Sequence, residues 1–110
     1  MKQYVIDELR PKDYENLKVY LEENFGSSGL RDIYWIPIEE KLLTSVQAEH
    51  VECQPFYFAL ALETNFLACE LLVRTKSNVR CSCMAYATQL QRDWLISRVD
   101  SIFTQLNIIT

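Results

Sequence analysis

Residues 53–87, CQPFYFALALETNFLACELLVRTKSNVRCSCMAYA, carry the strongest secondary-structure signal of the chain. Three runs rich in aromatic, branched and small apolar residues cover 53–63, 66–76 and 79–87. The polar pairs Thr64-Asn65 and Ser77-Asn78 separate them. Two polar residues between strand-length apolar runs are typical of β-hairpins. The segment therefore predicts an antiparallel meander of three strands.

A helix is predicted on each side of this meander. Pro11 suits a first helical position, because its missing N–H would be unpaired there, and Gly26 suits a helix stop. Between them an inward-facing stripe recurs at helical spacing: Tyr14, Leu17, Leu21 and Phe25. Thr88 with Gln91 forms a capping box that opens a second helix. Its inner face is expected to consist of Leu95, Val99, Ile102, Phe103 and Leu106, with Ile108 and Ile109 covering an edge of the core.

The remaining segments complete one domain that spans residues 1–110. Residues 3–9 indicate a short strand, and 33–38 indicate an edge strand, because Pro37 cannot donate to a central ladder. Residues 39–52 show the weakest pattern of the chain and predict no definite structure, although 39–43 and 44–50 are each compatible with a helical turn. Consecutive strands flanked by helices predict an α+β two-layer sandwich, with one antiparallel sheet and both helices on one face.

The composition limits the classes of protein to which the chain can belong. Its 110 residues are 49% hydrophobic and carry a formal charge of -4, so a disordered chain and a nucleic-acid partner are not expected. No apolar run approaches the roughly 20 residues of a membrane span, so no membrane partner is expected either. The acidic start, with Asp7 and Glu8, lacks the apolar block of an export signal. We therefore expect a cytoplasmic protein with reduced cysteines.

Alternation along the three strands divides the sheet into two faces. The face expected to meet the helices carries Phe56, Phe58, Leu60, Leu62, Leu67, Cys69, Leu71, Val73, Val79, Cys81, Cys83 and Ala85. The opposite face is neither polar nor fully apolar, which favours a surface that contacts a partner. Its expected partner-binding residues are Tyr57, Ala59, Ala61, Glu70, Leu72, Arg74, Met84 and Tyr86. On a regular strand Glu70 and Arg74 would lie on this face but too far apart for direct contact.

Two other chemistries are weighed against a contact surface. His50, Cys53, Cys81 and Cys83 are weak candidates for a metal or thiol site, because they lack the Cys-x-x-Cys knuckles of zinc sites. The alternative interpretation is that these cysteines pack as small core hydrophobes. Tyr34, Trp35 and Trp94 are candidates for an aromatic groove that binds a small ligand.

The two glycines exclude a glycine-rich phosphate loop, and no pair of acids is placed for acid–base catalysis. No cofactor is therefore expected, and a binding protein is favoured over an enzyme. The hypothesis is an acidic, cytoplasmic protein-binding module, adaptor-like or chaperone-like, that acts through its open sheet face as a homodimer. Small-ligand binding near Trp35 and Trp94 and the Cys/His metal or thiol site are the alternatives.

Overall fold

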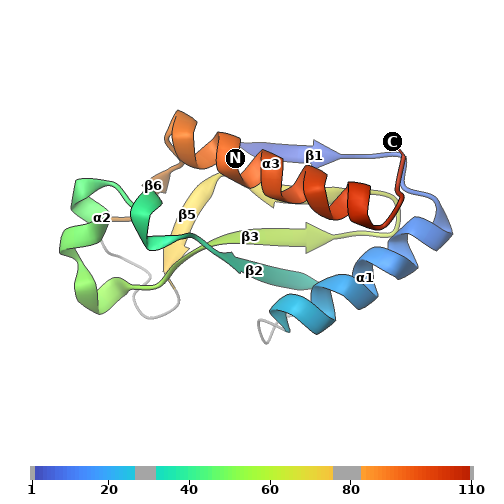
Figure 1. Cartoon of the computed structure of the whole chain (residues 1–110), viewed down its shortest axis with the longest axis horizontal. Coiled ribbons are helices and arrows are strands. Elements are labelled where there is room, and N and C mark those ends of the chain that lie inside the picture. The colour runs from blue at the N-terminus through green and yellow to red at the C-terminus, as the bar shows by residue number, and fades with distance from the viewer. Residues whose placement is uncertain (1, 27–31, 76–82, 110) are drawn as a thin grey trace.

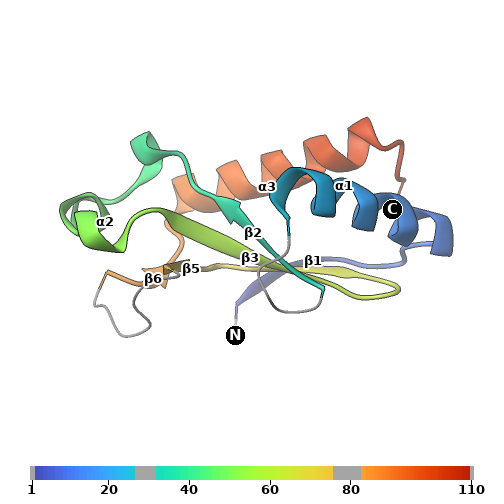
Figure 2. The ribbon, with the colours of Figure 1, turned by 90° about the horizontal axis from the view of Figure 1, so that it is seen from below.

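The computed structural model describes residues 2–26, 32–75 and 83–109. These residues form a two-layer α+β sandwich in which α1 and α3 cover one face of a six-stranded antiparallel sheet (Figures 1 and 2), as predicted. The elements are β1 (Gln3–Ile6), α1 (Pro11–Phe25), β2 (Ile33–Pro37), η1 (Glu40–Leu42), α2 (Ser45–Glu49), η2 (Val51–Cys53), β3 (Phe56–Leu62), β4 (Leu67–Glu70), β5 (Leu72–Thr75), β6 (Ala85–Tyr86) and α3 (Gln89–Gln105).

Strand β3 lies at the centre of the sheet. It pairs with β2 on one side and with both β4 and β5 on the other. Strands β1 and β6 then pair with the far sides of β4 and β5. In β2 the N–H of Ile38 donates to the carbonyl of Phe56 at 2.9 Å, so the nitrogen of Pro37 points away from β3. The prediction that Pro37 marks an edge strand is therefore confirmed.

The predicted single strand over 66–76 is divided at Leu71. Tyr57 pairs with Arg74, and Leu60 pairs with Cys69. An interval of three residues on β3 therefore lies opposite an interval of five residues on β4 and β5. The Leu71 N–H donates to the carbonyl of Lys2 at 3.1 Å, and its carbonyl accepts from Ala87 at 2.7 Å. Leu71 is thus the bulge at which β1 and β6 meet end to end. Two extra residues leave the alternation of faces unchanged.

The core lies between the sheet and the helices, on the face that the alternation predicts. The inward side chains of β3 are at most 1% exposed, and α1 and α3 cover them with their own buried stripes. The fully buried members of this core are Leu17, Leu21, Ile36, Phe56, Phe58, Leu60, Leu62, Leu67, Cys69, Val73 and Leu95. After α3, Ile108 is buried as expected, but Ile109 is 84% exposed and lies outside the buried core.

Other expected boundaries differ from the structure. Residues 53–55 are not strand, because η2 ends at Cys53 and a cis peptide bond joins Gln54 to Pro55 before β3 begins. The third meander strand includes only β6 among the residues described, and Val79 and Cys81 lie outside them. Cys83 is buried as expected, but Ala85 is exposed, because β6 is a two-residue strand at the edge of the sheet.

Two capping boxes join the start of α2 to the start of α3. Thr44 caps α2 and Thr88 caps α3, and the third residues of these helices are Gln47 and Gln91. Both glutamines are buried, and the Gln91 Nε2 donates to the Gln47 Oε1 at 2.9 Å and to the carbonyl of Leu42 at 2.9 Å. The buried side-chain amides at the starts of α2 and α3 are therefore hydrogen-bonded to each other inside the protein.

We expect Gln91→Leu to lower the free energy of unfolding by about 3 kcal/mol, because three hydrogen bonds are lost: the Leu42 carbonyl loses this donor, the Gln47 Oε1 loses one of its two donors, and the Thr88 N–H loses its acceptor. Thr88→Ala, which removes only the cap of α3, should cost about 1 kcal/mol. Urea unfolding followed by circular dichroism measures both. If both variants lowered the free energy of unfolding by the same amount, the buried hydrogen bonds donated by Gln91 would make no contribution to stability, which would contradict this prediction.

Candidate functional site

The side of the sheet turned away from α1 and α3, here called the outer face, is not covered by any described helix (Figure 2). The register places its side chains opposite one another on adjacent strands. Its residues in the strands are Gln3, Val5, Ile33, Trp35, Pro37, Tyr57, Ala59, Ala61, Ala68, Glu70, Leu72, Arg74 and Tyr86. Apolar side chains outnumber polar ones there, which is unusual for a sheet face that only meets water.

The outer face is hollowed near its centre. Its cavity of about 270 Å³ is lined by Ile33 and Trp35 from β2, Ala59 from β3, Glu70 from β4 and Arg74 from β5. The cavity exists because Ala59, which carries only a methyl group, lies between larger side chains on the neighbouring strands. The hollow therefore has one apolar wall and one charged wall.

The charged wall is a two-pronged ion pair. The Arg74 Nε and Nη2 lie 3.2 Å from the two carboxylate oxygens of Glu70. The expectation that these side chains are too far apart is wrong, because the bulge at Leu71 shortens the path between β4 and β5. Both side chains are less than one-third exposed, so the pair is more rigid than a surface ion pair. It adds no net charge to the outer face.

The apolar wall consists of Ile33 and Trp35 from β2. Outside the hollow Tyr57 packs edge to face against Trp35, with the ring centroids 5.4 Å apart. Trp94 lies elsewhere: it projects from α3 and stacks on Phe58 in the core, with centroids 6.3 Å apart. Because Tyr57 and Phe58 are consecutive on β3, they point to opposite faces. Trp35 and Trp94 therefore do not line one groove.

The remaining predicted contact residues lie around this hollow. Ala61 and Leu72 are partly exposed on β3 and β5, and Met84 is partly exposed directly before β6. Tyr86 is 44% exposed, and the ammonium group of Lys2 lies 5.4 Å from the centre of its ring. Leu72, Met84 and Tyr86 extend the apolar surface from the hollow toward β6, and Ala61 extends it toward the end of β3 that pairs with β4.

The candidate histidine and cysteine residues for a metal or thiol site lie in different surroundings. His50 ends α2, and its Nδ1 lies 2.6 Å from the carbonyl of Val46. Cys53 and Cys83 are buried and form no disulfide, and Cys81 lies outside the described residues. No group of three His, Cys, Asp or Glu side chains in the described part of the chain is placed to hold a metal. Burial raises the pKa of the Cys69 thiol to about 12, so it stays protonated and unreactive at neutral pH.

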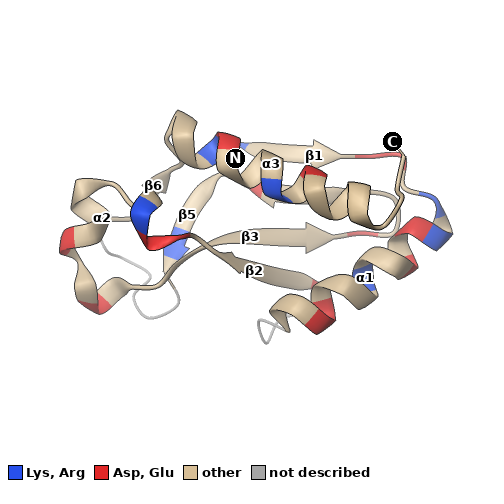
Figure 3. Cartoon of the chain, viewed as in Figure 1, with Lys and Arg blue, Asp and Glu red and all other residues tan. Residues whose placement is uncertain are grey.

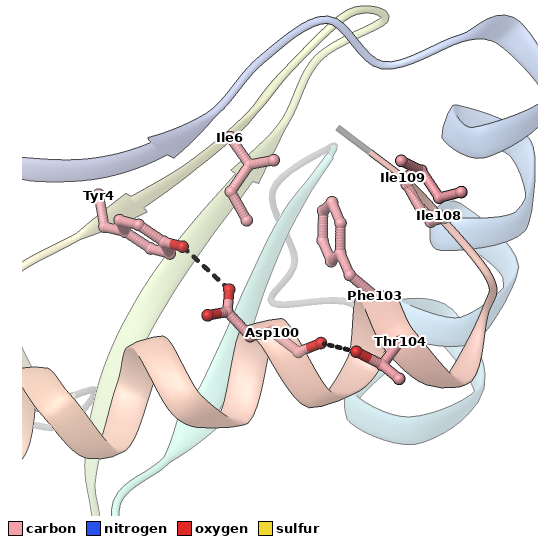
Figure 4. Close-up of a pocket in the computed structure, with 7 residues that line it drawn as sticks. All are labelled: Tyr4, Ile6, Asp100, Phe103, Thr104, Ile108 and Ile109. Atoms are coloured by element: carbon pink, nitrogen blue, oxygen red, sulfur yellow. Dashed lines mark hydrogen bonds between the residues drawn. The ribbon is translucent and has the colours of Figure 1, made fainter.

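A second hollow, of about 340 Å³, lies between β1 and α3 (Figure 4). Tyr4 and Ile6 line it from β1, and the C-terminal half of α3 and the residues after it supply the rest. The Tyr4 hydroxyl donates to the Asp100 Oδ1 at 2.9 Å. The sequence analysis missed this site, because its two polar residues are 96 positions apart and neither belongs to a local motif.

Comparison with known protein families, with curated proteins and with solved structures finds no match to this chain. Among the residues described, no helix has the length and apolar character that a membrane span requires. The chemistry of the two hollows must therefore be argued from their own residues.

Two tyrosines should ionise unusually late. Burial, followed by the hydrogen bond to Asp100, raises the pKa of Tyr4 to about 12. Burial, followed by the nearby charge of Glu22, raises the pKa of Tyr34 to about 12. Because both values exceed the unfolded value of about 10, the stability they confer is complete below pH 10 and is lost as the pH rises toward 12.

Ultraviolet titration of tyrosinate measures this directly. Tyr4→Phe should remove one of the phenols that ionise near pH 12 and should leave the ionisation near pH 10 unchanged. Tyr86→Phe removes a phenol at the exposed edge of the sheet and is the control for the loss of a tyrosine as such. Loss of a phenol that ionises near pH 10 in the Tyr4→Phe protein would contradict the hydrogen-bonded placement of Tyr4.

Proposed function

We propose that this chain is a protein-binding module, adaptor-like or chaperone-like, whose outer face binds a second copy of the chain to form a homodimer. The observation that carries the proposal is the apolar outer face, which surrounds a hollow and has no helix over it. Large contiguous apolar patches are rare on monomers and mark sites of association. Two-fold dimers are the commonest oligomers of soluble proteins.

The distribution of charge supports a second copy as the occupant. The only charged side chains of the outer face within the described strands are Glu70 and Arg74, and they neutralise each other. Most of the acidic residues that give the chain its net charge of -4 lie on α1 and in the connecting segments (Figure 3). Two outer faces can therefore meet without bringing unpaired like charges together.

The described cysteines support a cytoplasmic setting for this module. Cys53, Cys69 and Cys83 are buried and form no disulfide. Buried thiols persist in reducing compartments, whereas small secreted domains commonly use disulfides. An aromatic groove shared by Trp35 and Trp94 is not advanced as a second function, because the two rings lie on opposite faces of the sheet.

Light scattering after size exclusion tests the homodimer. We expect the wild-type chain to show twice the mass of one 12.9 kDa subunit. Ala61→Arg should weaken dimerisation at least tenfold, because it places a long cation on the apolar outer face, opposite Ile33 of the hollow, where the partner would bury it. Since Ala61 points away from the core, the subunit should remain folded.

Gln105→Arg adds the same charge at the exposed end of α3 and should leave the dimer intact. Circular dichroism and the thermal midpoint confirm that each variant is folded. A wild-type protein that stays monomeric at high concentration, or an Ala61→Arg protein that dimerises as the wild type does, would refute the proposed interface.

A further inference from the structure

Strand β1 has one edge that no described residue pairs with. Because the carbonyl of Lys2 accepts from Leu71, alternation directs the backbone groups of Tyr4 and Ile6 toward β4 as well. The N–H and C=O groups of Gln3 and Val5 therefore point outward. An edge with unpaired backbone groups is a template for a further strand.

The hollow between β1 and α3 lies beside this edge (Figure 4). Tyr4 and Ile6 face α3, so the pocket opens on the helix side of β1. In an added antiparallel strand, the residue opposite Tyr4 would lie on this same side, with its Cα about 4.5 Å from that of Tyr4. Its side chain would point into the pocket.

The chemistry of the pocket selects the side chain that fits. Its lining is half apolar and half polar: Ile6, Phe103, Ile108 and Ile109 supply the apolar part, and Asp100 supplies a carboxylate. Tyr4 occupies one oxygen of this carboxylate, and no described cation forms an ion pair with it. A side chain with an aliphatic stem and a cationic end, lysine or arginine, satisfies both features.

The surroundings of the edge favour the same ligand. Asp7 and Glu8 follow β1 directly and are exposed. The ammonium of Lys2 lies at the other end of the strand, over the ring of Tyr86. A basic segment that approaches the edge is therefore attracted by Asp7, Glu8 and Asp100 together.

We propose that the open edge of β1 and the adjoining pocket form a peptide-binding site, which adds an extended basic segment to the sheet and holds a lysine or arginine side chain against Asp100. The backbone of Gln3 and Val5 provides the hydrogen bonds, and the pocket provides the specificity, which is how strand addition works elsewhere. The pocket opens on the helix side of β1, opposite the outer face, so the binding of the lysine or arginine side chain does not depend on the proposed dimer.

The probe is the peptide acetyl-Thr-Lys-Val-Lys-Thr-amide, whose lysines face one side of an extended strand. Binding is followed by amide chemical shifts of the full-length protein, and the largest changes are expected at Gln3 and Val5. Replacing both lysines by glutamate should abolish binding. Replacing the central valine by proline should weaken it three- to tenfold, because one backbone hydrogen bond is lost.

Variants of the protein test the two halves of the site. Asp100→Asn keeps an acceptor for Tyr4 and should weaken the lysine peptide about fivefold, while a norleucine version of the peptide should bind both proteins equally. Val5→Pro removes the outward N–H and should weaken every peptide three- to tenfold. Val5→Thr retains that N–H and is the matched control. Ala61→Arg should bind the peptide as the wild type does.

Two results would overturn this site. Unchanged affinity of the lysine peptide for both Asp100→Asn and Val5→Pro would show that the peptide binds elsewhere. A dimer that Val5→Pro dissociates and Ala61→Arg does not would show that a second copy occupies the edge. That second result would also refute the outer-face dimer, whereas the first would leave it standing.

Discussion

The hydrogen bonds of Leu71 are the constraint on which the arrangement of the sheet depends. Its N–H binds β1 through Lys2, and its carbonyl binds the segment after β6 through Ala87. One irregular residue thus lets a single long ribbon, β4 and β5, hold two short strands end to end. Because the bulge adds two residues to the ribbon, buried and exposed side chains keep their faces on both sides of it.

The same bulge shapes the hollow of the outer face. It brings Glu70 and Arg74 together, which turns two potential surface charges into one neutral, rigid wall. The opposite wall consists of Ile33 and Trp35, and Tyr57 packs against the Trp35 ring. Rigid walls lower the entropy that is lost on association, because few side chains have to be ordered when a partner arrives. The hollow is therefore suited to contact as it stands.

The elements governed by local chemistry could be predicted from the sequence. Pro11 and the Thr88–Gln91 capping box gave the helix starts, and the period of two gave the buried face of β3. The bulge could not be predicted, because no glycine or proline marks Leu71. The contact of Tyr4 with Asp100 depends on tertiary packing between the two ends of the chain. The opposite placement of Trp35 and Trp94 follows from alternation, once Phe58 is known to face α3.

The two edges of the sheet differ in a way that bears on polymerisation. Pro37 interrupts the outer edge of β2, since its nitrogen faces outward without a hydrogen to donate. Strand β1, at the opposite border, has no such interruption. A fibril that grows by joining sheets requires a competent border on both sides of every subunit. The proline on one border therefore disfavours the edge-to-edge joining of folded subunits into an open-ended sheet, while the backbone of β1 leaves the opposite border without such a block.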